Sequence, residues 1–328
     1  MPGHAHTAAQ AALGIAARRS MRAPSVFNTQ PWRWQIAGDV ATLHVAEDRR
    51  LDVTDPDGRL LMLSCGAALH HATVTIAAEG WTPVVQRFPD PADPGLLARV
   101  RLGAYAPTDT EMLRLAAAIE QRRSDRRAFG DRPVSDELLT RLRRAVEAQG
   151  SYLHVVRGEQ VPNLAAAMAK AAAVERDDPA YAAERDLWTH RPAAAGDGVP
   201  PETAVRAAPR RVPVREFVAG DDAGLTAGGH DSGAVYTVLF GASSEPDGLL
   251  RGGEALSALL LGATAEGLST SVFSEAVETN WPRQLLSEVL GGVGVPYLVV
   301  RLGYVDADTP PPAAPRRDAA EVVGFEER

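Results

Sequence analysis

The stretch Arg122-Arg123-Ser124-Asp125-Arg126 gathers three arginines within five residues, between two segments with helical spacing. A second notable stretch, Ala23-Pro24-Ser25-Val26-Phe27-Asn28-Thr29-Gln30-Pro31-Trp32, lies far upstream. Its prolines fix the backbone, so that free N–H and C=O groups and the Asn28 amide can meet the polar edge of a ligand. Arginines form planar, charge-assisted bonds with phosphate, although at a helix end they also satisfy the last carbonyls.

Together the two stretches resemble the flavin-binding signatures of nitroreductase-family FMN proteins. In that family the arginine motif binds the phosphate and ribityl chain, and the proline-bounded loop comes from the other subunit of a dimer. Here both lie on one chain, with the loop upstream, which is most similar to the Acg-type branch, where one polypeptide imitates the dimer. The resemblance implies an α+β, nitroreductase-like fold of two tandem units that form an intramolecular pseudo-dimer around one FMN.

The resemblance also implies which residues bind the cofactor. Arg122, Arg123 and Ser124 would bind the phosphate and ribityl hydroxyls, and Arg126 would lie near the pyrimidine edge of the flavin. In the loop, the remaining candidates for contacts with the ring are Pro24, Ser25, Val26 and Asn28. In the segment Gly267–Glu275, which corresponds to a ring contact of the family, the candidate is Ser271. Near the C-terminus, the candidates are the basic pair Arg316 and Arg317.

Some candidates carry an alternative interpretation. Arg316 and Arg317 could instead form a solvated charge pair on a tail. Val26 and Phe27 are apolar where the family often has small polar residues, so they would crowd the ring. Arg18-Arg19-Ser20-Met21-Arg22 copies the arginine pattern but leads directly into Pro24, and we interpret it as the exposed end of the first helix.

An internal repeat supports two fused units. Gly66-Ala67-Ala68-Leu69 matches Gly253-Glu254-Ala255-Leu256, and position 253 minus position 66 is 187. Val100-Arg101-Leu102-Gly103 likewise matches Val300-Arg301-Leu302-Gly303 further along. Ordered matches of this kind are typical of a duplication whose loops changed length. The counterpart of the proline-bounded loop, residues 147–152, lacks prolines and asparagine, so we expect a single composite site.

The pattern predicts an N-terminal half, residues 1–106, and a C-terminal half, residues 107–328. The C-terminal half would contain a Pro/Gly-rich segment, residues 190–232, that acts as a lid over the cofactor or is disordered, and a C-terminal arm, residues 304–328. Apolar periodicity and turn residues predict helices and strands, with Gly80 ending the second helix and Ser135 capping the start of the fourth. The helices are expected at 7–22, 60–79, 111–122, 136–148, 164–188 with a break at 177–179, 249–266 and 281–290, and the strands at 32–36, 41–45, 84–88, 98–102, 152–156, 235–240 and 297–302.

Composition excludes several functions. A net charge of −8 argues against nucleic-acid binding, which needs a basic field. The single cysteine, Cys65, rules out an intramolecular disulfide, and without a signal-peptide pattern we expect the cytoplasm. The longest apolar runs, such as residues 255–265, are too short to span a bilayer. The eight histidines show no metal-ligand spacing.

The expected activity is reduction of nitroaromatic, quinone or similar small electron acceptors with NAD(P)H, by a ping-pong flavin mechanism. No catalytic side chain stands out, because the isoalloxazine itself carries out hydride and electron transfer. An alternative is a protein that binds or sequesters FMN without turnover, and a further one is an interaction scaffold without a cofactor. Whether the fused unit dimerises further stays open.

Overall fold

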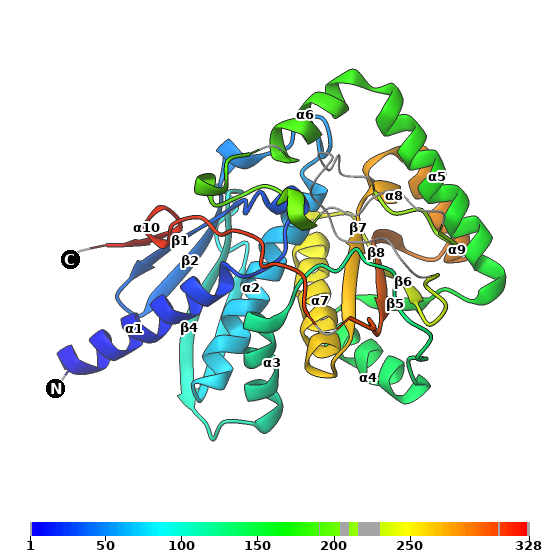
Figure 1. The fold of residues 1–328 in the computed structure, drawn as a ribbon. Coiled ribbons are helices and arrows are strands. Elements are labelled where there is room, and N and C mark those ends of the chain that lie inside the picture. The colour runs from blue at the N-terminus through cyan, green and yellow to red at the C-terminus, as the bar shows by residue number, and fades with distance from the viewer. Residues whose placement is uncertain (1, 190, 204–209, 216–229, 308, 327–328) are drawn as a thin grey trace.

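Two mainly antiparallel sheets flank a central pair of long helices (Figure 1). The computed structural model describes residues 2–189, 191–203, 210–215, 230–307 and 309–326. The predicted lid segment, 190–232, therefore falls partly outside the described residues. Each sheet packs on its own apolar core, and the cores meet at the helix pair. The fold is thus α+β, with two layered units joined through helices.

The first unit is continuous in sequence. Its elements are α1 (Pro2–Ser20), β1 (Trp32–Ala37), β2 (Val40–Val45), α2 (Arg59–Ala78), β3 (Trp81–Arg87) and β4 (Leu96–Tyr105). Gly80, with φ of +84°, ends α2 as predicted, because only glycine adopts this backbone without strain. Trp32, Trp34 and Ile36 on β1 are fully buried beneath α1 and α2, which explains the alternating pattern of that strand.

The second unit repeats this plan with insertions. Its counterparts are α4 (Asp136–Glu147), β5 (Tyr152–Val155), β6 (Val235–Gly241), α7 (Pro246–Ala265), β7 (Ser269–Phe273) and β8 (Val295–Gly303). The inserted or connecting helices are α3 (Thr110–Gln121), α5 (Val161–Asp177), α6 (Pro179–Thr189), α8 (Glu275–Glu278) and α9 (Asn280–Val289). Ser135 caps α4 as expected, since its hydroxyl accepts from the Leu138 N–H.

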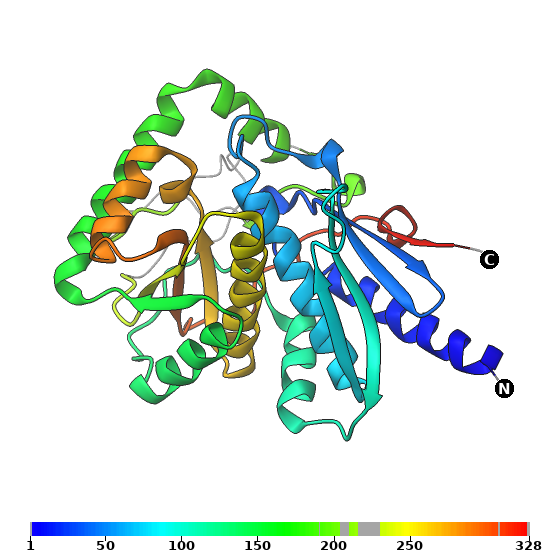
Figure 2. The ribbon, with the colours of Figure 1, turned by 180° about the vertical axis from the view of Figure 1, so that it is seen from behind.

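The two sheets have the same topology. The order is β3-β4-β2-β1 in the first and β7-β8-β6-β5 in the second, and every neighbouring pair among these strands is antiparallel. Strand β7 was not among the predicted strands, because Ser269–Phe273 is short and starts with polar residues. Figure 2 shows the first sheet from behind, with β3 and β4 as a long hairpin beside α2.

Helices α2 and α7 form the seam between the units. Ser257 on α7 contacts two histidines of α2, with its Oγ 2.8 Å from Nδ1 of His70 and 2.9 Å from Nδ1 of His71. Each histidine thus has a hydrogen-bond partner at Nδ1. Among the described residues, α2 is also long and apolar enough to cross a membrane, but 83% of it is buried in the protein, which accounts for its composition.

The C-terminal arm returns to the first unit. Its strand β9 (Val323–Phe325) pairs in parallel with β1, in register Trp34 with Val323, and adds a fifth strand to the first sheet. Figure 1 shows this arm crossing from the end of β8 to the edge of β1. The sequence assigns residues 304–328 to the second half, yet β9 of this arm belongs to the first sheet, because the open edge of β1 offers unpaired backbone groups.

Candidate functional site

A deep pocket lies where the two units meet. It encloses about 1270 Å³ between its walls, counting the open mouth. Its walls come from both units and include every predicted cofactor-binding residue except Arg317. These are Pro24, Ser25, Val26, Asn28, Arg122, Arg123, Ser124, Arg126, Ser271 and Arg316. Segments more than 250 residues apart thus contribute to one site, as Asn28 and Arg316 do.

One end of the pocket is strongly cationic. Arg22, Arg122, Arg123 and Arg316 line it together. The only carboxylate paired with them among the described residues is that of Glu120, 3.1 Å from Nη2 of Arg22. Arg22 was predicted to lie at an exposed helix end; its side chain is 42% exposed and also lines the pocket.

The buried arginines of this cluster lack counter-charges. Arg122 is only 6% exposed, and its Nε and Nη1 have no hydrogen-bond partner among the described residues. Burial, together with the charge of Arg123, lowers the pKa of Arg122 to about 10. Burial and the neighbouring Arg122, Arg22 and Arg123 lower the pKa of Arg316 to about 9. Unpaired N–H donors with crowded positive charges form a site that an anion would complete.

The local backbone sets the arginine segment against β7. Helix α3 ends at Arg122, whose ψ of 128° leaves the helical region. The chain then runs beside β7, where Ser124 forms a bridge with Thr270 and the Asp125 N–H donates to the Thr270 carbonyl at 2.8 Å. Arg122 and Ser124 therefore sit on backbone that is held by a strand.

A buried arginine fixes the next turn of this segment. Arg301, fully buried on β8, donates through Nη2 to the carbonyls of Asp125 and Arg127 at 2.9 and 2.8 Å. Its Nη1 is 2.8 Å from both carboxylate oxygens of Asp231, which in turn accepts the Phe129 N–H at 2.7 Å. In the sequence, Arg301 stood out only as part of the repeat. A charged residue within an apolar strand was the available signal.

The proline-bounded loop has a constrained conformation. Phe27, Asn28 and Gln30 all have positive φ, between 47° and 56°, which is uncommon for residues with side chains. The surrounding structure holds them there: the Ser25 hydroxyl accepts the Gln30 N–H at 2.9 Å, and Phe27 packs against Trp188. Val26 and Phe27 line the pocket with apolar surface, as the sequence suggested.

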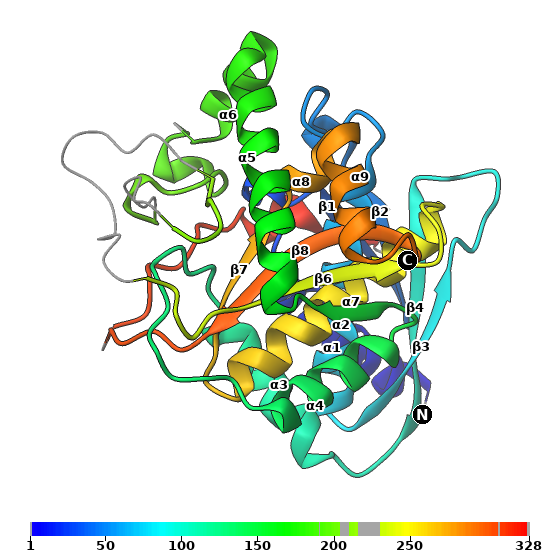
Figure 3. The same ribbon diagram turned by 90° about the vertical axis from the view of Figure 1, so that its right-hand side faces the viewer.

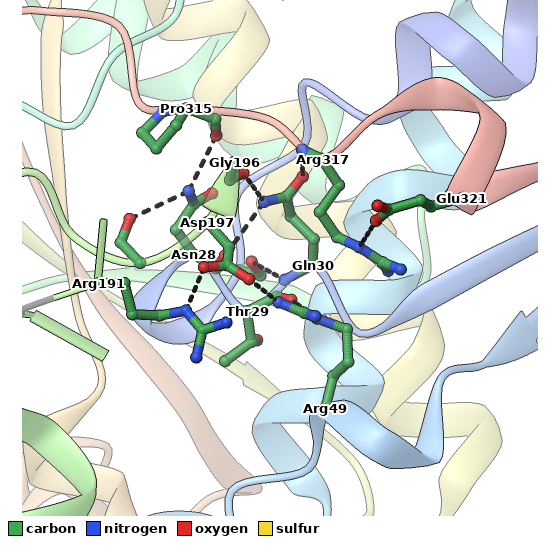
Figure 4. A network of polar contacts seen from close by, with 12 residues as sticks. Asn28, Thr29, Gln30, Arg49, Arg191, Gly196, Asp197, Pro315, Arg317 and Glu321 are labelled. Atoms are coloured by element: carbon green, nitrogen blue, oxygen red, sulfur yellow. Dashed lines mark hydrogen bonds and ion pairs between the residues drawn. The ribbon is translucent and has the colours of Figure 1, made fainter. Parts of the chain in front are cut away.

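The Asn28 amide ties the loop to two distant segments. Its Nδ2 donates to the Gly198 carbonyl at 3.1 Å and to the Pro315 carbonyl at 3.0 Å (Figure 4). Its Oδ1 accepts from Nη1 of Arg316 at 2.9 Å. Both amide protons are thus engaged by protein, while the oxygen has one further lone pair. Contact between Asn28 and a flavin ring stays a prediction.

Residues 191–203, here called the strap, are fastened to the same loop. Asp197, 4% exposed, pairs with Arg49 and Arg191, and the Gly196 carbonyl accepts from Nε2 of Gln30 at 2.9 Å (Figure 4). Gly198, Val199, Pro200 and Thr203 of the strap line the pocket. The described part of the predicted lid thus forms a wall of the site.

Arg317 points elsewhere. Its N–H donates to Oε1 of Gln30 at 3.1 Å, while its guanidinium lies 3.5 Å from Glu321 (Figure 4). It does not line the pocket, so the structure does not bring it together with the other predicted cofactor-binding residues. The reason is geometric: successive residues of the extended arm point to opposite sides, and Arg316 takes the inner side.

The other end of the pocket holds a buried ionic cluster. Arg215 contacts Glu175, Glu275 and Glu278 at 3.0, 3.4 and 2.7 Å, and Arg126 donates to the Thr203 hydroxyl at 3.1 Å. Burial raises the pKa of Glu275 and raises that of Glu175 to about 7, while Arg215 opposes both shifts. No sequence motif indicated this cluster, because its members are dispersed along the chain. Among the described residues, no group of His, Cys, Asp or Glu has a metal-binding arrangement.

Two units of one topology that share a pocket with a cationic end at their junction define a tandem α+β protein. The chain is 39% identical to "Putative NAD(P)H nitroreductase acg" of Mycobacterium tuberculosis over 315 residues, which cover 94% of this chain and 93% of that protein. It is 36% identical to "Putative NAD(P)H nitroreductase Rv3131" of the same organism over 316 residues, covering 94% and 90%. The chain therefore belongs to the nitroreductase family.

The solved structure of the FMN- and NADPH-dependent nitroreductase NfnB from sphigopyxis sp. strain HMH covers 65% of this chain and 99% of that one, at 20% identity and a TM-score of 0.44. The sequence matches no protein-family model.

Proposed function

We propose that the chain binds one FMN in the pocket between its halves and uses NAD(P)H to reduce nitroaromatic, quinone or similar small acceptors in a ping-pong cycle. The observation that carries this proposal is Arg122, a buried guanidinium with two unpartnered donor atoms at a cationic pocket end. A ligand with a phosphate would supply the missing partner. The names of the two relatives support the same activity.

The residues of the pocket fit the two ends of FMN. Arg122, Arg123 and Arg316 would bind its phosphate, and Ser124 the ribityl hydroxyls. The apolar side chains of Val26, Phe27 and Val199 would exclude water from the ring, and the backbone around Ser271 would meet its polar edge. When bound, FMN supplies hydride and electron transfer through its isoalloxazine ring.

Arg126 would set the charge near the ring. It lies at the opposite end from the phosphate cluster, where burial lowers its pKa to about 10 and Glu275 opposes that shift. At neutral pH it therefore remains a cation in a water-poor site. A fixed positive charge there favours an anionic reduced flavin.

We also propose that the single chain does the work of a dimer in the cytoplasm. The matching sheet orders of the two halves support this, as does a pocket whose loop and arginine segment come from different halves. Light scattering on the purified protein, combined with flavin quantification, tests it. A monomer with one FMN per chain is expected; two FMN per chain would contradict it.

A second candidate is an FMN-binding protein without turnover. The strap favours this alternative, because Asp197, Gln30 and Asn28 fasten it to the loop and its residues form a pocket wall. Such a wall would hinder nicotinamide from reaching the ring.

Anaerobic mixing of the flavin-loaded protein with NADPH or NADH distinguishes the two functions. Rapid bleaching of the flavin absorbance, and reoxidation by menadione or a nitroaromatic, is expected for the enzyme. A flavin that dithionite bleaches but neither nicotinamide does would favour storage. A purified protein with no affinity for FMN would overturn both.

A further inference from the structure

A second cavity lies on the same seam, apart from the cationic pocket. It is lined by α2, α7, β3, α3 and α4, and it encloses about 1480 Å³ counting its mouth. Helices α3 and α4 both pack against α7, and Figure 3 shows them together below the helix pair. The two pockets share no lining residue.

One end of this cavity lies where the repeat would place a second copy of the first pocket. With the offset of 187 residues that also separates His70 from Ser257, Val85 corresponds to Val272 and Arg87 to Ser274. Val272 and Ser274 line the first pocket, and Val85 and Arg87 line the second cavity. The two halves of the repeat thus line a cavity with corresponding residues.

The charges of the second cavity are paired, in contrast to those of the first pocket. Arg87 makes two parallel bonds to Glu254, 2.8 Å from Nε and 2.7 Å from Nη2. At the mouth, Arg114 and Arg141 both contact Glu266, at 3.0 and 3.1 Å. Each arginine of the lining therefore has a carboxylate, and nothing in this cavity calls for an anionic ligand.

Most of the remaining lining is apolar, with Thr73, Gln149 and His70 as the neutral polar residues. It consists mainly of aliphatic side chains, namely Val74, Val85, Leu115, Leu138, Leu142 and Ala258. His70 is the main neutral polar group, and burial lowers its pKa to about 4, so it is uncharged at neutral pH. Its Nδ1 is taken by Ser257, whereas no partner of its Nε2 is found among the described residues. One hydrogen bond to a ligand hydroxyl or carbonyl is thus available.

We propose that this second cavity binds an uncharged aromatic molecule that carries a hydroxyl or carbonyl group. Apolar walls around one or two polar groups are the usual make-up of a small-molecule site. Every arginine among its described lining residues is paired with a carboxylate, so we expect its ligand to be uncharged, unlike the phosphate-bearing ligand proposed for the first pocket. The site does not depend on FMN binding.

Isothermal titration calorimetry tests this with 2-naphthol, which is uncharged at neutral pH, and with naphthalene-2-sulfonate. Both are titrated into the full chain, with and without saturating FMN. We expect one 2-naphthol per chain under both conditions and no binding heat from the sulfonate. Competition between 2-naphthol and FMN, or equal binding of the sulfonate, would overturn the proposal.

Matched variants locate the site. Val85→Trp fills the cavity and should abolish the 2-naphthol heat, whereas Val84→Trp, next along β3 but outside the lining and 52% exposed, should not. If Val85→Trp lowers the thermal midpoint, Leu115→Trp with Leu113→Trp as control makes the same comparison on α3. Equal effects within either pair would contradict the assignment.

A charge variant tests the selectivity. Glu254→Gln removes the carboxylate that neutralises Arg87 while keeping its shape. The sulfonate should then bind, and 2-naphthol should bind less well than the sulfonate. A variant that still rejects the sulfonate would show that the pairing of Arg87 with Glu254 does not set ligand charge.

Discussion

Gly66 on α2 and Gly253 on α7 face one another across the seam in a reciprocal contact. A Cβ on Gly66 would lie 2.9 Å from Cα of Gly253, and a Cβ on Gly253 would lie 2.8 Å from Cα of Gly66. The nearest backbone atoms are likewise reciprocal, namely the carbonyl oxygens of Leu250 and Leu63. These glycines are repeat counterparts, so the contact marks the local two-fold axis that relates the halves.

Gly66→Ala should destabilise the protein. The added methyl would meet backbone of α7, which cannot move aside as a side chain can, and overpacking of this kind costs about 1–3 kcal/mol. Urea unfolding followed by circular dichroism measures the effect. Gly262→Ala on α7 is the control, since its Cβ would approach only the flexible Leu142 side chain. Equal losses of stability in both variants would show that α2 and α7 are not in close backbone contact at Gly66.

Arg122→Gln should weaken FMN binding and, without flavin, stabilise the protein. Loss of a charge-assisted bond to phosphate should cost about 1.5–3 kcal/mol of affinity. Removal of a buried, unpartnered charge should raise the free energy of unfolding of the flavin-free form. Flavin fluorescence titration and urea unfolding measure the two effects. Arg143→Gln, on the exposed side of α4, should change neither.

The same charges predict a pH dependence. The pKa values of Arg122 and Arg316 are about 10 and about 9 in the folded protein, below the usual 12.5. At neutral pH both are charged whether folded or unfolded, so the folded state bears the full penalty. As the pH rises through about 9 and about 10 the folded protein loses these protons first, and the penalty falls.

The stability gained by the double variant Arg122→Gln/Arg316→Gln over the flavin-free wild type should therefore be largest at neutral pH. It should shrink as the pH rises through about 9 and about 10. Urea unfolding at several pH values gives this difference directly. A difference that is constant or grows with pH would show that the two guanidiniums are not destabilised in the folded state.

Arg301→Met should disturb the arginine segment indirectly. It removes two bonds to the carbonyls of Asp125 and Arg127 and leaves Asp231 buried without its closest partner, at a cost of about 3–5 kcal/mol. Asp231→Asn in addition should restore part of the stability but not FMN affinity, because the carbonyls stay unpaired. Full recovery of FMN affinity in the double variant would argue against a positioning role.

Asp197→Asn should loosen the strap. It removes the carboxylate that pairs with Arg49 and Arg191, so the wall formed by Gly198–Thr203 should open more often. If this wall limits access, stopped-flow mixing should show faster flavin reduction by NADPH, with little change for the smaller reductant dithionite. An unchanged NADPH rate would mean that the strap does not limit access.

Local patterns predicted much of the framework. Helix α2 ends just before the predicted Gly80, and α4 begins directly after the predicted cap Ser135. The Asp-Asp-Pro break separates α5 from α6 at residues 177–179. These signals act over a few residues, within the reach of backbone chemistry. The resemblance also named ten residues that the structure brings to one pocket. What they bind stays a prediction until flavin binding is measured.

Long-range polar pairing was not predictable. Arg301 and Asp231 are 70 residues apart, and Asn28 and Arg316 are 288 apart, so no periodicity links them. Asn28 was assigned to a ligand because its amide suits one, and no local pattern indicated that both amide protons would bond to distant carbonyls of the protein. Arg316 and Arg317 look alike in sequence, and only the path of the arm decides which of them faces inward.

The arm also sets an order for assembly. Arg316 of the arm completes a pocket whose other walls begin at Arg22, and β9 holds the arm on β1. A ribosome must therefore have made nearly the whole polypeptide before the arginine cluster of the pocket can be complete. Messages cut short upstream of Arg316 would yield chains that keep most of both apolar cores but lack this arginine, so tight ligand binding would indicate that translation had run past residue 316.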